Sequence, residues 1–564
     1  MLLLAQLVAP PLQQGPVRLP ENRPSLERRA PARGAEQPPL EVMPDDNAKP
    51  PLDGEPAPEA PVPAVPSGGL PAIEGLTLYD NDRLRDILAD CSQISAPAER
   101  LNACAAALTA QFVADGYVNS RVFVELTPAP GRLLVVEGRL VELRVNGNDD
   151  RLNRRVARLM RSLQGTLLHL PSLERQLQLL RRVPGVKQVR GNLSRLGSDP
   201  TQATLTITLE GGAPAWQGDL SLRNDGNNGS GDARAVASFL KPGALVAGDV
   251  LLLYGELNSD DEPELGAAIT SLTYTLPLGD AFNLTTAFGA SRRDLIELDP
   301  PADGLSTTQL QGLGQLEWVF SESLTQRWNA FLGISGSSSR TRLDGASLPS
   351  TVPEIIRKPR SGYLRLGVGG SGQGVGVGWG GSAYLLAGLS GMSPAEQRRE
   401  WREAGIDPSQ ATAIGGLISA GWAFAPGWQL NGRLAGQWAF NPLLPSMQFS
   451  LGSDVGLRGL PAQLISGDSG WLAVTEASWT FWQNRSHALQ LVPFIGAGGV
   501  RSELSDFNFS DTLGSGGLLL RWLAGDNWAF ELGWAHQFST GTLEGPWNDW
   551  VLDDGLYAKA QFRF

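Results

Sequence analysis

The dominant pattern in the chain is an alternation of apolar and polar positions, in segments of about ten residues, from residue 217 to the end. Gly, Asn, Asp and Pro separate the segments, as turn residues separate strands. Clear examples are residues 249–258, 266–276, 282–291, 309–320 and 326–337. The last segment places on one face Leu556, Ala558, Ala560, Phe562 and Phe564, and on the other Tyr557, Lys559, Gln561 and Arg563. Such segments are β-strands with one apolar and one polar face.

The number of segments favours a closed transmembrane barrel over a soluble sandwich, although a sandwich also alternates. About sixteen segments fit between residues 217 and 564, at roughly 22 residues for a strand and its loop. Membrane-spanning strands need about 9–11 residues, and bacterial barrels have even strand numbers. A closed sheet also has no edge whose backbone would stay unsatisfied in lipid. We therefore predict a 16-stranded antiparallel barrel over residues 213–564.

Tryptophans accompany these segments, and their amphipathic rings are favoured where a membrane meets water. They are Trp318, Trp328, Trp379, Trp422, Trp428, Trp438, Trp479, Trp482, Trp528 and Trp534. The same residues could instead form a sandwich core or a sugar-binding platform, so an acidic surface lectin or adhesin stays open as a function of a different class.

Two small α+β units precede the barrel, over residues 72–138 and 139–212. In the first unit, helical spacing over 82–93 and 99–115 is followed by alternation over 120–126 and 132–137. In the second unit, a strand at 141–145 is followed by helices at 152–163 and 171–183 and by strands at 186–193 and 203–209. Each unit therefore reads β-α-α-β-β and is long enough for a small core.

Residues 1–71 hold 17 of the 40 prolines, which indicates an extended, disordered linker. The apolar run over residues 1–9 resembles the end of a signal peptide that lacks its basic start. The proline spacing leaves room for a short lumen-plugging helix only around residues 25–30.

Composition excludes several classes of function. The chain has 564 residues, 67 glycines, three histidines and a net charge of -12, and no uninterrupted apolar stretch long enough for a spanning helix. Nucleic acid is not expected as a partner of so acidic a chain. Phosphate-loop, Cys-x-x-Cys and His-Glu-x-x-His motifs are absent from the sequence. We expect no enzyme activity, no catalytic residues, no cofactor and no metal.

Particular motifs carry a family resemblance. Gly116, Tyr117, Val118, Ser120 and Arg121, followed by the glycines and apolar residues of 131–138, resemble the polypeptide-transport-associated (POTRA) domain of two-partner secretion transporters, the TpsB proteins of haemolysin secretion/activation type. The second unit is similar to that family's second POTRA domain over residues 173–177 and 183–186. The resemblance covers roughly residues 76–564.

The barrel extends the resemblance. Residues 445–452, the tip Leu457-Arg458-Gly459-Leu460 and residues 467–470 look like the long loop that in the family folds back into the lumen as a strut or gate. The strand motif Phe494-x-Gly496-x-Gly498 stands where the family has Phe-x-Asp-x-Gly. The terminal Phe564 fits the signal read by the barrel-assembly machinery.

Two departures from the family pattern affect the loop. Its tip ends in Leu460 rather than Tyr or Phe, and Gly496 replaces the aspartate that pairs with the loop arginine. A partly buried Arg458 without a counter-charge is costly. We therefore predict a substitute partner for Arg458, with Glu476 and Asp468 as the first candidates.

The resemblance implies that the POTRA units receive an unfolded substrate, through strand addition at an exposed sheet edge. Residues 151–195 contain eleven Lys or Arg and one acid, Glu174. This basic zone could attract an acidic substrate or anionic lipid, or could simply be a solvated face. The candidate substrate-binding residues are Tyr117, Arg121, Arg151, Arg154, Arg155 and Arg158.

Cys91 and Cys104 lie thirteen residues apart, one in each predicted helix of the first unit. In an oxidising periplasm we expect them to form a disulfide, with two buried thiols as the alternative.

These observations predict an outer-membrane translocator of a Gram-negative-type cell, with its POTRA domains in the periplasm. Its expected partners are one large β-helical exoprotein, the barrel-assembly machinery and outer-membrane lipid, and we expect a monomer. The alternative within the same superfamily is a factor that inserts proteins into the outer membrane.

Overall fold

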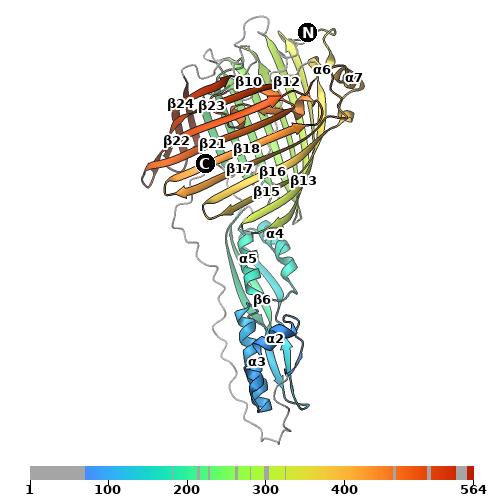
Figure 1. Cartoon of the computed structure of the whole chain (residues 1–564), viewed down its shortest axis with the longest axis vertical. Helices are drawn as coiled ribbons and strands as arrows, with labels where there is room; N and C mark the ends of the chain where they lie inside the picture. Colours follow the sequence, from blue (N-terminus) through green and yellow to red (C-terminus); the bar gives the residue numbers. More distant parts are fainter. Residues whose placement is uncertain are drawn as a thin grey trace. The chain divides into compact units, whose positions relative to one another are not determined.

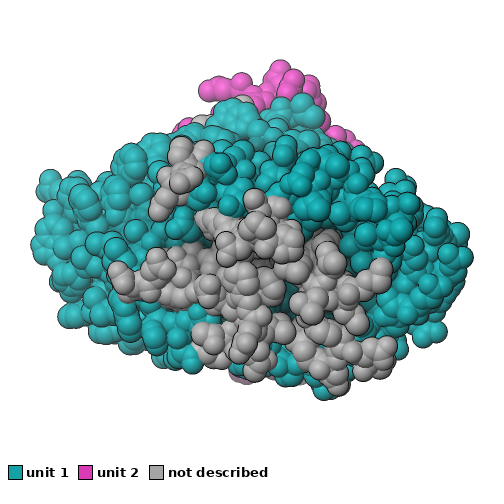
Figure 2. Space-filling model, turned by 90° about the horizontal axis from the view of Figure 1, so that it is seen from above, with its two compact units in different colours: residues 1–33, 215–245, 249–564 teal, residues 34–214, 246–248 magenta. Residues whose placement is uncertain are grey.

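The computed structural model describes residues 70–564 except 182, 184, 198, 212–215, 227–228, 261–263, 280, 297–303, 324, 461–464, 505–509 and 541–554. The described residues form two compact units, one of residues up to 214 with 246–248 and one of the remaining residues (Figure 2). The predicted linker, apart from residues 70 and 71, lies outside the described residues, as does the signal-like run.

The larger unit is a closed antiparallel barrel of sixteen spanning strands, which confirms the predicted fold class and excludes the sandwich (Figure 1). The last strand pairs with the first, from Lys559 opposite Arg223 to Arg563 opposite Asp219. The strands are β7 (Gln217–Arg223), β8 (Ala233–Pro242), β9 (Val250–Ser259), β10 (Leu265–Leu278), β11 (Phe282–Asp294), β12 (Leu305–Glu322), β13 (Gln326–Leu343), β15 (Arg360–Gly374), β16 (Val377–Gly388), β17 (Thr412–Ala425), β18 (Trp428–Ala439), β21 (Ser469–Gln483), β22 (His487–Arg501), β23 (Ser510–Ala524), β24 (Trp528–Thr540) and β25 (Leu556–Arg563).

The alternation places apolar side chains outside and polar ones inside. On β25, Leu556 is 56% exposed and the neighbouring Tyr557 is 2% exposed. In a protein with water on both sides of its wall, a row of exposed leucines and phenylalanines would be unfavourable. In lipid the same row is solvated by acyl chains, so the outer face is the membrane-facing face.

Most outward aromatic rings gather where short turns join the strands. Rings contact one another from strand to strand, with Phe282 and Trp318 6.4 Å apart and Trp428 and Trp479 5.5 Å apart between centroids. This end also holds the start of β7 and the end of β25. The arrangement matches an aromatic girdle at the membrane interface.

Some strands extend beyond their predicted ends. β12 and β13 have 18 residues each, because they continue past the membrane-facing band. There both faces are polar, as at Ser337, Ser338 and Ser339, so alternation no longer marks a strand. The opposite end of the barrel carries long loops, with a two-residue strand β14 (Ala346–Ser347), helices α6 (Glu354–Arg357) and α7 (Ala395–Glu403) and a 3-10 helix η3 (Ser390–Met392), none of which we predicted.

The smaller unit contains two three-stranded sheets, each with two helices, in the predicted β-α-α-β-β order. The first sheet has the order β1-β3-β2 and the second the order β4-β6-β5. The first group comprises β1 (Ala72–Glu74), α2 (Asn81–Ile87), η1 (Cys91–Gln93), α3 (Pro97–Ala114), β2 (Arg121–Glu125) and β3 (Arg132–Val136). The second comprises β4 (Arg139–Gly147), α4 (Asp150–Met160), η2 (Arg161–Leu163), α5 (Leu170–Leu180), β5 (Val186–Leu196) and β6 (Asp199–Gly211).

Local sequence signals explain where these helices start. Asp80 caps α2 through a hydrogen bond from the Arg83 amide, and Asp149 caps α4 through the amides of Arg151 and Leu152. Each group has its own core, which includes Phe112 in the first and Leu177 in the second. No helix within the described part of the chain is long and apolar enough to cross a membrane.

A disulfide joins Cys91, in the short helix η1, to Cys104 in the middle of α3. Their Cα atoms are 5.2 Å apart, and both residues lie in the core of the first group. The covalent link therefore fixes η1, and with it the end of α2, against α3.

Replacing both cysteines by alanine should weaken the first group of elements selectively. A disulfide that closes a loop of about this length contributes roughly 3 kcal/mol, mostly by restricting the unfolded chain. We expect hydrogen exchange of α2 and α3 in the full chain to quicken in the Cys91→Ala/Cys104→Ala variant. Exchange of α4 and α5 provides the internal control, and equal exchange of α2 and α3 in both proteins would contradict the prediction.

Candidate functional site in the barrel lumen

The chain between β18 and β21 turns back into the barrel. It forms a small hairpin of β19 (Phe449–Leu451) and β20 (Ile465–Gly467), flanked by the 3-10 helices η4 (Pro445–Met447) and η5 (Ser453–Val455). Leu451, Leu457 and Leu460 of this segment are fully buried. They pack with inward-facing residues of the wall, namely Leu472 on β21, Val500 on β22 and Leu513 on β23. The loop therefore lies inside the lumen, held by a small apolar core.

Inward-facing glycines make room for the loop. A Cβ atom on Gly496 would lie 2.6 Å from Val474 Cγ1 and 2.8 Å from Leu457 Cδ2. A Cβ atom on Gly498 would lie 2.6 Å from Leu451 Cδ2. All three distances are well inside normal carbon contact. The absence of an aspartate at Gly496 thus has a steric reason, because the loop leucine and a wall valine occupy its space.

Four charged side chains form a closed ring at the tip of the loop. The Arg458 guanidinium donates to Glu476 Oε2 on β21 at 2.7 Å and to Glu531 Oε2 on β24 at 2.8 Å. Arg521 on β23 completes the ring, with Nε 2.6 Å from Glu531 Oε1 and Nη2 3.4 Å from Glu476 Oε1. Two arginines thus alternate with two glutamates, and the ring has no net charge.

The ring is shielded from water. Its side chains are between 4% and 19% exposed, and the Phe494 and Tyr557 rings lie 5.7 and 5.9 Å from Arg458 Cζ. In such a setting an unmatched charge would be strongly unfavourable, whereas a matched and hydrogen-bonded set is tolerated. Aromatic faces near a guanidinium add a smaller cation–π attraction. The arrangement fixes the loop tip to two strands of the wall, β21 and β24, whose glutamates are also held by Arg521 on β23.

The backbone of the tip is shaped for this approach. Gly456 and Gly459 have φ values of 115° and 81°, in the left-handed region that favours glycine. The amide of Leu460 returns to the Leu457 carbonyl oxygen at 3.3 Å, which closes the turn around Arg458. Leu460, where the family pattern has an aromatic residue, fills the apolar core of the loop instead.

Of the two partners suggested for Arg458 by sequence, the structure places Glu476 against it and Asp468 elsewhere. Asp468 is buried at the base of the loop, where its carboxylate accepts from the Leu443 and Glu503 amides and from Gln448. It fastens the two ends of the loop rather than the tip. Glu531 and Arg521 were missed, and the only signal for them was a charged residue at an inward position of a strand.

The candidate substrate-binding residues of the small unit lie in two different settings. Arg151, Arg154 and Arg158 are exposed on α4, while Arg155 is partly buried. Tyr117 instead lies where the two groups of elements meet, with its ring 4.9 Å from the ring of His169.

Arg121 makes local hydrogen bonds, and its neighbour Asn119 makes the contact between the two groups of elements. Arg121 donates to the carbonyl oxygens of Val118 and Ser120, and the neighbouring Asn119 donates to Thr201 O at 2.9 Å. Because Asn119 is buried, this junction excludes water. Tyr117 and Asn119 therefore contribute to the junction, and a substrate contact by Tyr117 or Arg121 stays a hypothesis.

Phe564 closes the barrel seam. Its amide and carbonyl exchange hydrogen bonds with Gly218 at 3.1 and 2.9 Å, and its ring lies over Gly218 and 6.2 Å from the ring of Phe239. The last residue of the chain thus pairs with the first barrel strand on the membrane-facing side.

The barrel, the inward loop and the two small α+β groups together define an outer-membrane β-barrel transporter of the two-partner secretion class. The chain belongs to the haemolysin secretion/activation protein family ShlB/FhaC/HecB, whose match covers residues 202–516, more than half of the chain. The protein is located in the outer membrane.

Named relatives agree with this assignment. The outer membrane transporter CdiB of Dickeya dadantii is 23% identical over 387 residues, which is 66% of this chain and 65% of that protein. CdiB of Escherichia coli strain 536 is 25% identical over 505 residues, which is 85% of this chain and 79% of that protein. The solved structure of CdiB from Escherichia coli shares the fold with a TM-score of 0.64 at 17% identity, over 93% of this chain and 94% of that one.

Breaking the ring at Arg458 should release the loop. Arg458→Ala leaves the Glu476 and Glu531 carboxylates with one guanidinium of the ring, that of Arg521, and removing one partner of a buried ion pair costs about 3–5 kcal/mol. We expect protease cleavage within residues 445–469 of the folded, detergent-extracted barrel and larger conductance in planar bilayers. Arg399→Ala, on the exposed face of α7, is the control.

A double variant tests whether charge balance is the cause. Arg458→Met/Glu531→Gln leaves the neutral pair of Arg521 and Glu476, so it should resist protease better than Arg458→Ala. Equal cleavage of wild type and Arg458→Ala would contradict a fastening role of the ring.

Proposed function

We propose that this protein receives an unfolded exoprotein in the periplasm through its two POTRA-like groups and passes it across the outer membrane through the barrel. The observation that carries the proposal is the loop between β18 and β21, whose residues 449–460 and 465–467 lie in the lumen and which is fastened to the wall at its tip. A permanently open pore would not need such a fastening. We therefore assign the loop a gating role.

The ring is suited to a gate because it is a discrete contact. Its four side chains come from the loop and from β21, β23 and β24, so displacement of the loop breaks two ion pairs at once. The Arg521 contacts to Glu531 and Glu476 remain on the wall when Arg458 leaves. Hence the wall keeps one cation facing two carboxylates, which attract Arg458 back after a substrate has passed.

Two edge strands support substrate capture by strand addition. β2 and β5 lie at the edges of their sheets, and β5 has eleven residues, with Lys187, Arg190 and Arg195 exposed along it. These charges favour acidic segments of an extended substrate along β5. The exposed arginines of α4, which packs on β4 at the other edge of the sheet, form a second basic surface.

No nucleotide is required by this proposal. An exoprotein that folds outside the cell into a large β-helix cannot return through a narrow lumen, so folding makes transport directional. The partner is proposed as one such exoprotein, with the barrel-assembly machinery acting on Phe564 during biogenesis. The protein is proposed to be monomeric and to catalyse no reaction.

The secretion proposal is tested by searching the neighbouring reading frames for a large β-repeat exoprotein and co-expressing that exoprotein with this chain in a Gram-negative host. Exoprotein should appear in the medium with wild-type barrel and fall at least tenfold with Arg458→Ala, while heat-modifiable migration shows that the variant barrel still inserts. Depletion of the protein should leave other outer-membrane proteins at normal levels. Loss of those proteins, with secretion unaffected, would identify a membrane-insertion factor instead.

Charge reversal on α4 tests the basic surface. Arg151→Glu/Arg154→Glu/Arg158→Glu should lower secretion several-fold, and the loss should be greatest at low ionic strength, where charges are least screened. The control Arg399→Glu/Arg402→Glu changes an exposed helix of the barrel loops. Unchanged secretion and unchanged salt dependence would mean that these arginines form only a solvated face.

A further inference from the structure

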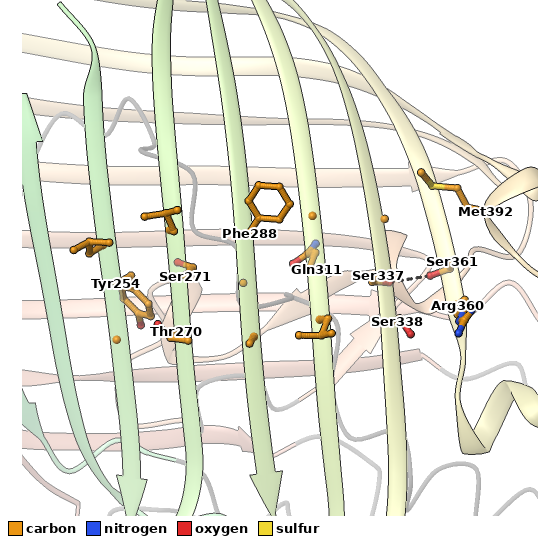
Figure 3. Close-up of a pocket in the computed structure, with 18 of the residues that line it drawn as sticks. Tyr254, Thr270, Ser271, Phe288, Gln311, Ser337, Ser338, Arg360, Ser361 and Met392 are labelled. Atoms are coloured by element: carbon orange, nitrogen blue, oxygen red, sulfur yellow. Dashed lines mark hydrogen bonds between the residues drawn. The ribbon is translucent and has the colours of Figure 1, made fainter. Parts of the chain in front are cut away.

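A groove of about 930 Å³ crosses the outer wall of the barrel over β8 to β15 (Figure 3). Its side chains belong to the membrane-facing set, since Leu272, Phe288 and Leu310 are 42%, 64% and 60% exposed. Some lining residues, such as Ser271 and Gln311, have side chains that face the lumen. Each stands in the sequence between two outward-facing lining residues, so its backbone borders the groove. The groove therefore opens towards lipid, not towards the lumen.

Glycines form the floor of the groove. Phe288 on β11 lies opposite Gly312 on β12, which lies opposite Gly336 on β13, so two neighbouring strands present no side chain in this row. Met392, in the loop helix η3, closes the far end, because a Cβ atom on Gly336 would lie 3.4 Å from its Sδ and Cε atoms. A trough thus runs between the Phe288 ring and Met392.

The depth of the groove in the membrane follows from the strand spacing. The girdle residue Phe282 marks the end with the short turns, and Arg292 lies ten residues further along the same face of β11. At about 3.4 Å per residue and a tilt near 40°, this separation is about 25 Å in height, the thickness of the apolar band. The trough therefore lies in the half of the membrane nearest the long loops, just below Arg292.

Arginines gather directly beyond the trough. Arg292 on β11 and Arg340 on β13 both lie opposite Thr308 on β12, and Arg360 on β15 lies opposite Ser338, two residues from Arg340. Arg292 is paired with Asp294. Arg340 and Arg360 are exposed and have no carboxylate partner among the residues that the structure describes. Two uncompensated cations thus border an apolar trough at the outer surface of the membrane.

We propose that this groove binds a phosphorylated glycolipid of the outer leaflet, the lipid A part of lipopolysaccharide. Its phosphates would contact Arg340 and Arg360, and an acyl chain would lie on Gly312 and Gly336 between Phe288 and Met392. Charge and position both favour this occupant, because the arginines lie at the end of the barrel opposite the periplasmic short turns. The inference is independent of the secretion proposal and rests only on the outer-membrane location.

The charge part of the site is tested by native mass spectrometry of the full chain in detergent, with purified lipid A as the probe. Arg340→Gln/Arg360→Gln should weaken lipid A binding at least tenfold, and lipid A stripped of its phosphates should bind wild type as weakly. The control Arg399→Gln/Arg402→Gln removes two exposed arginines of α7 and should bind as wild type. Equal binding of lipid A by all three proteins would overturn the proposal.

The groove itself is tested by filling it. Gly312→Leu places a side chain in the trough, where its Cβ atom would meet the Phe288 ring at an ordinary 3.8 Å. Gly314→Leu changes the same face of the same strand outside the groove, with Ile334 3.9 Å away. Gly312→Leu should weaken lipid A binding at least fivefold and Gly314→Leu should not. Equal effects of the two variants, or equal binding of phosphatidylglycerol and lipid A by wild type, would reject a lipid A site.

Discussion

The rest of this structure depends on the matching of charge inside the lumen of the barrel. Arg458 reaches the wall at the tip of a loop that is held by Asp468 at its base and by buried leucines along its length, and it lies between Glu476 and Glu531. An arginine in that position without carboxylates would favour a loop outside the lumen, because burial of an unpaired charge costs more than the small apolar core returns. The position of the loop, and hence the proposed closed state of the pore, follows from this ring.

The ring also explains how the chain can have Gly496 in place of the family's aspartate and still hold Arg458 by ion pairs. Gly496 provides space rather than charge, and Leu457 and Val474 fill that space. The negative charge lies instead on β21, at Glu476, and on β24, at Glu531, and Arg521 on β23 balances the second carboxylate. A carboxylate restored at Gly496 would meet the loop leucine before it met Arg458. At the loop tip, one strand of the wall therefore provides space and other strands provide the charges that Arg458 needs.

Features that depend on the pattern within one strand could be predicted from the sequence. Contacts that depend on the register between strands could not. Alternation along β25 is visible in nine residues, so the barrel, its two faces and its strand number could be predicted. Glu531 joins the ring only because the registers of β23 and β24 carry it opposite Arg521, and no local signal reports register between distant strands. The position of Tyr117 at a junction between segments some 50 residues apart could not be predicted for the same reason.

Glycine has opposite consequences on the two faces of the same wall. On the inner face, Gly496 and Gly498 are filled by residues of the loop, so the missing side chains are replaced by the protein itself. On the outer face, Gly312 and Gly336 are only partly covered, by Phe288 and Met392, and a groove remains. In a bilayer such a groove is filled by acyl chains, because an empty space loses the dispersion contacts of its lining. At these four positions the inner-face gaps are therefore filled by the protein loop, whereas the outer-face gaps form the groove that we propose binds a lipid.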